Sequence, residues 1–422
     1  MAVSNHSSSS GRRALHRVLG LVSILSLAGA ACSDGDPVPT SDAVPTVGAD
    51  TGADDGQADP LERDDAGATA RASAPTTRWR TDVQDTGNRW AQGSVDLDAA
   101  PVEIDLPGTP VWVVAAGPTS WHVELDDGSA VRVDESGAGE PTAAAWPDPP
   151  EVRPSDNGEG VEVFSAHRLQ TLFVDPLPDT RVVYSGPTLV ALSEPTDRYG
   201  HGVLGDRIEA GAIEILDESS RTPRRITIEP PAVIEGISPM LADLDGDGEM
   251  EIVVTTAQSE DGARLEVWSL DGEFVAASAP VGRGNRWRNQ LGAAPLGPNG
   301  EVELVDVQTP HIGGIVQFFR LEGDQLVRHA SISSFTTHAI GSRNLDQGVL
   351  VDTTGDGRPE VLVLSTSARD LVAIERTADG ADVVAEVPLD ASVRTNLALR
   401  PTAETTALAV GTSDGRLLVW TG

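Results

Sequence analysis

From about residue 80 onward, apolar residues occur in short runs rich in Val, Leu and Ile, and clusters of Gly, Asp, Pro and Ser separate one run from the next. The 3.6-residue spacing of an amphipathic helix does not recur in this part of the sequence. Short β-branched runs bounded by turn-forming residues are typical of strands. The pattern therefore predicts an all-β fold.

The runs repeat as a unit of strand, polar loop, second strand and turn. Four clear copies and two looser ones are present: 247–273, 299–324, 356–380 and 405–422, then 109–129 and 187–218. The first apolar residues of the equivalent strand in the clear copies are Ile252, Leu304, Val361 and Leu408. These positions are 52, 57 and 47 residues apart. A period near 50 residues with about four strands per unit is typical of β-propeller blades.

The number of blades follows from the gaps between copies. The wider spacing between Val111 and Leu189 indicates insertions or a further blade around residues 146–187. The last copy stops after its third strand, and we expect residues 93–106 to supply the fourth. The sequence predicts a β-propeller of six to seven four-stranded blades over residues 79–422.

The first 31 residues have the features of a signal peptide. A basic stretch at residues 12–17 precedes an apolar run that is too short to remain as a membrane span and that ends in small residues. The single cysteine, Cys32, follows the sequence LAGAA, which resembles a bacterial lipobox although Gly29 stands where Leu is usual. Two interpretations stay open. One is lipidation of Cys32, which we favour because an unpaired exported thiol is unusual, and the other is ordinary cleavage near Ala30.

Residues 32–78 join this segment to the predicted propeller. They are rich in Asp, Ala, Gly, Pro and Thr and contain almost no large apolar side chain, so they cannot bury enough surface to fold. We expect a disordered tether that holds the folded domain away from a membrane. The protein is then an exported lipoprotein of the bacterial cell envelope, periplasmic or on the cell surface, and it touches the membrane only through its lipid anchor.

The charge of the chain narrows the possible partners. The formal net charge is −35, which opposes contact with nucleic acid phosphates and with anionic lipid. The sequence contains no lysine, which excludes Walker phosphate loops and lysine Schiff bases. Zinc-protease motifs and a Gly-x-Ser-x-Gly elbow are also missing from the sequence. We expect a monomer that does not bind nucleic acid.

The most distinctive motif is the acidic stretch at residues 243–251. Asp243, Asp245 and Asp247 alternate before a glycine, as at the start of an EF-hand. An EF-hand needs a carboxylate at its twelfth position and a helix after it, but that position is Val254, within an apolar run that reads as a strand. The motif instead resembles the calcium loop of FG-GAP or VCBS repeats, the propeller blades of integrin α subunits and many secreted bacterial proteins.

This resemblance implies a Ca²⁺ site between the first and second strands of a blade. The implied ligands are Asp243, Asp245, Asp247, the backbone carbonyl of Glu249 and the carboxylate of Glu251. A second copy implies the equivalent set: Asp352, Thr354, Asp356, the carbonyl of Arg358 and Glu360. The ion would be structural, because protein or water fills every ligand position. The alternative is that both loops are ordinary β-turns, since Asp and Gly favour turns without any ion.

A third copy, at residues 295–303, keeps Asn299 and Glu303 in the same register. Pro295 and Gly297 stand at the first and third positions and offer no side-chain oxygen. Because hard calcium needs six to eight oxygen ligands, we expect this loop to have lost its metal.

The remaining candidate residues fall in loops expected on the opposite side of the blades, where the second strand joins the third and one blade joins the next. They are Tyr199, His201, Arg286, Trp287, Arg288, His311, His338, Arg343 and Asn344. Arg with aromatic and amide partners is typical of sites that bind carboxylates, phosphates or sugars. The alternative is that these side chains satisfy buried carbonyl groups and pack between blades.

Two functions therefore remain for the domain. The first is a non-catalytic, Ca²⁺-stabilised scaffold that binds a protein or glycan partner. The alternative is a hydrolase or lyase that uses His201, His311, His338 and the nearby arginines. A flat face whose side chains bond to the backbone would favour the scaffold, and a concave pocket lined by His and Arg would favour the enzyme.

Overall fold

The computed structural model describes residues 86–134, 136–143, 152–154, 160–165, 168–172, 175–217, 223–401 and 405–422. All the described residues belong to one compact unit. The predicted signal peptide, Cys32 and the predicted tether lie outside the described residues.

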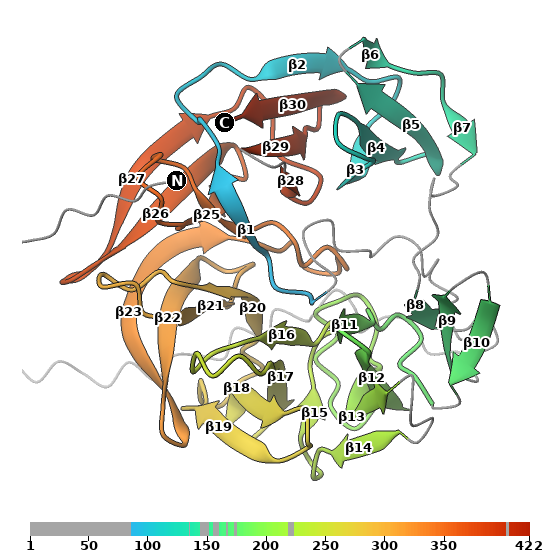
Figure 1. The fold of residues 1–422 in the computed structure, drawn as a ribbon, viewed down its shortest axis with the longest axis vertical. Coiled ribbons are helices and arrows are strands. Elements are labelled where there is room, and N and C mark those ends of the chain that lie inside the picture. Colours follow the sequence, from blue (N-terminus) through green and yellow to red (C-terminus); the bar gives the residue numbers. More distant parts are fainter. Residues whose placement is uncertain are drawn as a thin grey trace, which may run out of the picture. The chain divides into compact units, whose positions relative to one another are not determined.

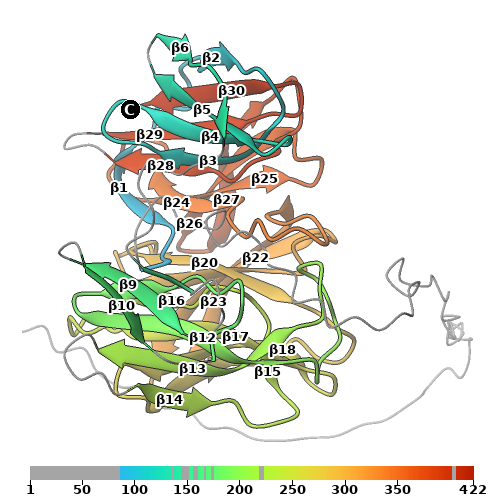
Figure 2. The ribbon, with the colours of Figure 1, turned by 90° about the vertical axis from the view of Figure 1, so that its right-hand side faces the viewer.

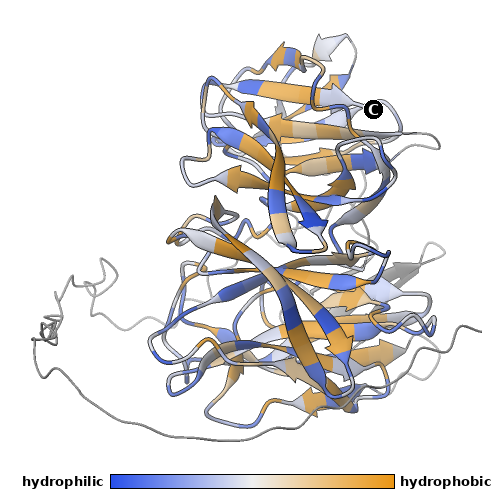
Figure 3. Cartoon of the chain, turned by 90° about the vertical axis from the view of Figure 1, so that its left-hand side faces the viewer, coloured by the Kyte–Doolittle hydropathy of each residue, from blue (hydrophilic) through white to orange (hydrophobic). Residues whose placement is uncertain are grey.

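The regular structure of the described residues consists of strands, which confirms the all-β prediction (Figure 1). Hydrophobic residues are concentrated along these strands, and the connecting loops are mostly polar (Figure 3). In the described part of the chain, no helix has the length and apolar character needed to cross a membrane.

Antiparallel meanders follow one another along the chain, and the first two are the least regular. The first comprises β3 (Pro110–Ala115), β4 (Trp121–Leu125), β5 (Ser129–Asp134), β6 (Gly137–Ala138) and β7 (Thr142–Ala143). The second comprises β8 (Val152–Pro154), β9 (Val161–Ser165) and β10 (Arg168–Leu172). This second meander lies in the region around 146–187 where the sequence spacing left room for an insertion or a further repeat.

Four-stranded meanders occupy the middle of the chain. The first of them has β11 (Val183–Ser185), β12 (Thr188–Thr196), β13 (Glu209–Asp217) and β14 (Arg224–Thr227). The next has β16 (Met240–Ala242), β17 (Glu251–Gln258), β18 (Gly262–Ser269) and β19 (Phe274–Ser278). Between them, β15 (Val233–Ile234) pairs with both β13 and β17.

Two further meanders of the same kind follow. One has β20 (Arg288–Ala294), β21 (Glu303–Gln308), β22 (Gly314–Glu322) and β23 (Gln325–Thr336). The other has β24 (Val349–Asp352), β25 (Glu360–Ser365), β26 (Asp370–Thr377) and β27 (Gly380–Pro388). The anchor residues Ile252, Leu304 and Val361 accordingly lie in the second strand of each meander.

The last meander is completed by a strand from the beginning of the described chain. It contains β28 (Ala398–Pro401), β29 (Thr406–Gly411) and β30 (Arg416–Thr421), and β2 (Val102–Asp105) pairs antiparallel with β30. The register runs from Val102 opposite Val419 to Asp105 opposite Arg416. The prediction that residues 93–106 supply the missing strand is therefore confirmed. Nearby, β1 (Trp90–Ser94) pairs in parallel with β24 and also contacts β20, β28 and β29.

Burial differs between the second and the fourth strand of a meander. Every residue of β17 except the last is buried, whereas β27 is largely exposed. A strand that is buried on both faces has a continuous apolar sequence rather than an alternating one. This explains why the second strands were the easiest to find in the sequence.

The core lies between successive meanders rather than within one of them. Phe318 of β22 packs in one cluster with Val361 of β25, and Leu408 of β29 packs in another with Leu362 of β25. Side chains of β3, β4 and β5 form a cluster with those of β28, β29 and β30, and Figures 1 and 2 both show β3 beside β28. The meanders in these clusters therefore bury one another's faces, and this leaves the loops to carry the polar chemistry.

Candidate functional site

The first acidic loop joins β16 to β17 and is folded by its own aspartates. The backbone N–H groups of Gly246 and Gly248 donate to Asp243 Oδ1 (2.7 Å) and Oδ2 (3.1 Å). The N–H of Asp247 donates to Asp245 Oδ1 (3.1 Å). Both glycines have positive φ, 80° and 91°, which a residue with a Cβ rarely adopts. One ligand oxygen each from Asp243, Asp245 and Asp247 lies within 4.8 Å of the others.

Glu251 lies at the edge of this carboxylate group. It is the first residue of β17, is 7 % exposed, and its Oε2 accepts a hydrogen bond from the N–H of Leu244 (2.8 Å). Burial, together with the negative charges of the three aspartates, raises the pKa of Glu251 to about 7. A divalent cation would offset this repulsion, and the all-oxygen donor set suits Ca²⁺. The residues present therefore fit the ion that the sequence implied.

The second acidic loop joins β24 to β25 and repeats the same turns. Asp352 Oδ1 accepts from the N–H of Gly355 (2.6 Å) and Asp352 Oδ2 from the N–H of Gly357 (2.9 Å). Ligand oxygens of Asp352, Asp356 and Glu360 lie within 4.8 Å of one another. Burial, with the charges of both aspartates, raises the pKa of Glu360.

The side chain of Arg358 points away from the second loop. Its Nη1 pairs with Glu375 (3.3 Å), and its Nη2 donates to the carbonyl of Arg376 (3.0 Å). The backbone carbonyl of Arg358 is thus the group that the residue can offer to an ion, as the resemblance implied.

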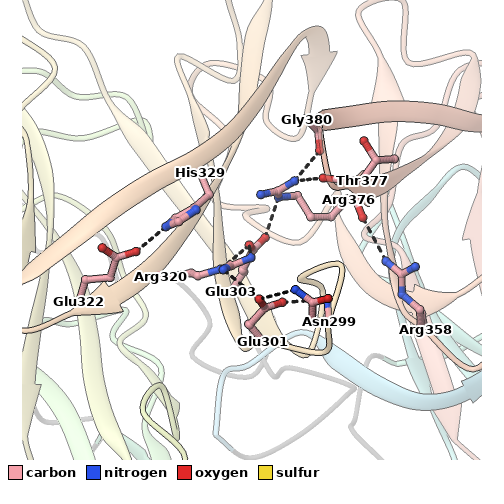
Figure 4. A network of polar contacts seen from close by, with 10 residues as sticks. All are labelled: Asn299, Glu301, Glu303, Arg320, Glu322, His329, Arg358, Arg376, Thr377 and Gly380. Carbon is pink, nitrogen blue, oxygen red and sulfur yellow. Dashed lines mark hydrogen bonds and ion pairs between the residues drawn. The ribbon is translucent and has the colours of Figure 1, made fainter. Parts of the chain in front are cut away.

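At the third loop, residues 295–303, an arginine from a neighbouring strand binds the acidic side chains, whereas the other two loops concentrate negative charge (Figure 4). Arg320 of β22 binds Glu303 through Nε (2.8 Å) and Nη2 (2.7 Å), and its Nη1 binds Glu301 (3.1 Å). Arg376 of β26 adds a second ion pair to Glu303 (3.1 Å). A Cβ on Gly297 would meet the side chain of Glu301 first and would lie 3.0 Å from Arg320 Nη2, so the glycine makes room for this ion pair. The sequence analysis missed both arginines, because they lie on other strands.

Loops on the opposite side bring several predicted residues together. Tyr199 and His201 come from the β12–β13 loop, and their rings lie 6.0 Å apart. Trp287, just before β20, lies 4.8 Å from the ring of His338 and is stacked 6.5 Å from that of His311. The two histidine rings are 5.9 Å apart.

Two buried glutamates that the sequence analysis did not single out complete this cluster. Glu235 follows β15 and binds Nδ1 of His201, and Glu209 begins β13; both are almost fully buried. Burial raises the pKa of Glu235, and burial together with the charges of Glu235 and Asp206 raises that of Glu209. Burial also lowers the pKa of His338 to about 4, so its ring is neutral at neutral pH.

Most of the predicted side chains are held by internal partners. Trp287 Nε1 donates to the carbonyl of Glu235 (2.9 Å), and His338 Nε2 donates to that of Ser342 (2.7 Å). Arg343 forms ion pairs with Asp179 and Asp206. Asn344, which is buried, accepts a hydrogen bond at Oδ1 from the N–H of Asp346 (3.0 Å).

Two arginines of the predicted ligand face, Arg286 and Arg288, differ in their exposure to solvent. Arg288 is 3 % exposed and lies in β20, where it pairs with Asp306 and binds Ser278 (2.8 Å) and Gln317 (2.6 Å). Its assignment to an accessible ligand face is therefore wrong, because the guanidinium is needed to satisfy polar groups between strands. Arg286 is exposed, as expected.

Three exposed isoleucines stand on the loops that surround this cluster. Ile312, Ile340 and Ile208 are 73 %, 65 % and 41 % exposed. Their loops contact one another: the N–H of Gly341 donates to the carbonyl of Val203 (2.9 Å), and Thr336 Oγ1 donates to that of Pro310 (2.6 Å). The sequence analysis missed these residues, because it searched the loops for polar chemistry.

No protein-family model matches the chain, and no curated protein matches it in sequence. Among solved structures, it is similar to BBS1N in complex with ARL6DN, with a TM-score of 0.44 and 13 % identity over 78 % of this chain and 97 % of that one. It is also similar to the WD40 β-propeller domain of Doa1, with a TM-score of 0.41 and 9 % identity over 76 % of this chain and 96 % of that one. Similarity at this level identifies neither a family nor a ligand, and the FG-GAP/VCBS resemblance stays a prediction.

Proposed function

We propose that the protein is an exported, lipid-anchored β-propeller of the FG-GAP/VCBS type that acts as a non-catalytic binding scaffold for a protein or glycan partner. In this proposal each meander is a blade, and the described residues would make seven blades, the last one closed by β2. Packing of successive meanders against one another supports this arrangement.

Calcium would hold the loops that join the first and second strands. The observation in favour is that two of these loops gather three carboxylates each, whereas the carboxylates of the loop at 295–303 pair with Arg320 of β22. Asp243, Asp245, Asp247, the carbonyl of Glu249 and the carboxylate of Glu251 would hold one ion. Asp352, Asp356, Glu360, Thr354 and the carbonyl of Arg358 would hold a second.

Binding would take place at the three isoleucine-bearing loops. Exposed apolar side chains on linked loops favour contact with a partner surface, since each would lose water-exposed area on binding. Trp287 and His338 bind backbone carbonyl groups and Arg343 binds aspartates, so these side chains would support the loops rather than contact the ligand. The internal contacts of Trp287, His338 and Arg343 are the observation that carries the non-catalytic proposal.

The test compares three proteins in cross-linking from an envelope extract, with a glycan array in parallel. They are the wild type, the double variant Ile312→Ser/Ile340→Ser, and the control Phe274→Ser, which alters a 50 % exposed residue of β19. The proposal predicts that wild type and control capture the same partner and that the double variant loses it. Equal capture by all three would contradict the assignment of this face.

The alternative is a hydrolase or lyase, and one observation favours it. His201 is bonded to the buried Glu235, and its side chain is 14 % exposed, so the imidazole is oriented and reachable. Such a pair is suited to proton transfer. If purified protein turns over polysaccharide or ester substrates and His201→Gln abolishes the turnover at unchanged melting temperature, the enzyme replaces the scaffold.

A further inference from the structure

A buried ion-pair cluster joins four separate segments of the chain. Asp346, which precedes β24, binds Arg89 Nη1 (2.8 Å) and Arg181 Nη1 (2.9 Å). Arg89 also donates to the carbonyls of Gly348 (2.8 Å) and Leu397 (2.7 Å). Asp346, Arg89 and Arg181 are 2 %, 3 % and 7 % exposed. The single charge of Asp346 is therefore shared by two guanidinium groups.

Arg181 leaves one edge of its guanidinium without an acceptor. Its Nη1 makes both contacts to the Asp346 carboxylate (2.9 and 3.0 Å), whereas Nε and Nη2 are buried and have no hydrogen-bond partner among the described residues. The guanidinium Cζ also lies 5.7 Å from the centroid of the Trp112 ring. In a planar guanidinium the Nε–H and one Nη2–H are parallel, and this edge is the one that carboxylates and other anions bind with two hydrogen bonds. Two unpaired donors on a buried cation are costly.

A cavity of about 20 Å³ is lined by Arg181 together with Arg89 and Asp346. Asp346 is the only acidic side chain among the described residues that line it. The volume is sufficient for one guest of the size of a water molecule or a small ion.

The polar neighbours of the cavity do not serve the unpaired edge of Arg181. Gln290 donates to the carbonyl of Ser238 (3.1 Å) and accepts from Thr255 Oγ1 (2.7 Å). Asn289 donates to the carbonyl of Leu345 (3.0 Å). A water bound to both N–H groups of Arg181 would be neutral and would leave two guanidinium groups with one carboxylate. A halide accepts hydrogen bonds without donating any, and its negative charge would balance the second guanidinium, for which the cluster has no carboxylate.

We propose that this cavity binds a chloride ion, held by the Nε–H and Nη2–H of Arg181 on the side away from the Asp346 carboxylate. The ion would stabilise the junction of the four segments and would be distinct from the two calcium loops, which take cations. Its ligand class, a small monovalent anion, follows from the two parallel donors and the size of the cavity.

The direct test is diffraction from crystals of the protein grown or soaked in sodium bromide, with data collected at the bromine edge. The proposal predicts an anomalous peak at hydrogen-bonding distance from Nε and Nη2 of Arg181. A peak of ordinary water density without anomalous signal, or an empty cavity, would overturn it.

The solution test measures the melting temperature at fixed ionic strength and saturating calcium while chloride replaces methanesulfonate. The wild type should melt higher in chloride by about 2 °C or more, since a ligand that binds only the folded state stabilises it. Arg181→Met should lose this response, and the control Arg283→Met, which alters an exposed surface arginine, should keep it. An equal response in both variants would contradict the site, and if Arg181→Met fails to fold, the bromide experiment on the wild type decides.

Discussion

Residues 243–251 and 295–303 occupy the same place in successive meanders, between the first and second strands, but they deal with negative charge in different ways. In the first loop three aspartates gather beside the buried Glu251, and burial with their repulsion raises the pKa of Glu251 to about 7. In the loop at 295–303, hydrogen bonds from Asn299, together with the charge of Arg320, lower the pKa of Glu301 to about 2.

The same loop position can therefore have its carboxylates paired with an arginine of the protein, as at 295–303, or can gather unpaired carboxylates, as at 243–251. Arg320 supplies a fixed positive group to Glu301 and Glu303, and Gly297 leaves the space that it needs. The loop at 243–251 has no such guanidinium among the described residues, and its carboxylates stay close together. In the calcium proposal, metal dependence is therefore a property of individual loops and not of the repeat as a whole.

Replacing the internal cation should give the largest effect. Arg320→Met leaves the fully buried Glu303 with only Arg376, and breaking a buried ion pair costs about 3–5 kcal/mol of unfolding free energy. Urea denaturation in saturating calcium measures the loss. Arg283→Met, at a 79 % exposed arginine paired with the 71 % exposed Glu260, is the control and should cost less than about 1 kcal/mol. Equal losses in the two variants would show that Arg320 does not replace an ion.

A pH titration extends the comparison to His338, a buried side chain that is neutral at neutral pH. The folded pKa of His338 is lowered from 6.5 to about 4, so between these values the unfolded chain binds a proton that the folded chain does not. The stability contributed by this group is complete above pH 6.5 and falls by about 3 kcal/mol as the pH drops to 4.

His338→Gln is the matched variant, because its amide can still donate to the carbonyl of Ser342. The unfolding free energy of wild type and variant should diverge as the pH rises from 4 to 6.5 and then run parallel. Curves that stay parallel over the whole range would rule out a buried neutral histidine as their cause.

Calcium removal should lower stability by about 2–3 kcal/mol, the value expected when the ion is present at about 100 times its dissociation constant. Differential scanning calorimetry with and without a chelator measures the shift. Asp247→Ala should remove most of the response, whereas Asp271→Ala, at an 86 % exposed turn aspartate, should keep it. Identical melts of the wild type with and without chelator would refute calcium in both loops.

A smaller effect should sharpen the contrast between the two acidic loops. Thr354→Asp adds a carboxylate to the loop at 352–360 and should strengthen calcium binding by about 1 kcal/mol, because opposite charges attract more strongly. Without calcium the same variant should be slightly less stable than the wild type, since the new charge lies near Asp352 and Asp356. Calorimetric titration checks the first effect and thermal melting the second; unchanged affinity would mean that position 354 lies outside the ligand set.

The sequence was informative wherever the chemistry is local. Strands such as β17 and β25 were detectable because both of their faces are buried, and the acidic loops because their carboxylates lie within nine residues. The pairing of β2 with β30 followed from the missing strand in the last repeat.

The remaining features depend on contacts between distant positions. Arg376 is 73 residues from Glu303, and Arg181 is 165 residues from Asp346, so no local pattern marks either pair. The prediction for Arg288 was wrong for a related reason. A charged residue beside a loop is usually exposed, but Arg288 is buried because it pairs with Asp306 on the next strand.

The pairing of β2 with β30 also has a consequence for biosynthesis. Glu103 of β2 and its partner Arg416 are 313 residues apart, so the first strand leaves the ribosome long before the one that completes its sheet. At about 5–20 residues per second, β2 waits roughly 15–60 s as an unpaired edge. Chains that stop before Arg416 would never cover this edge, and a cell could therefore distinguish unfinished copies from complete ones by the exposed strand alone.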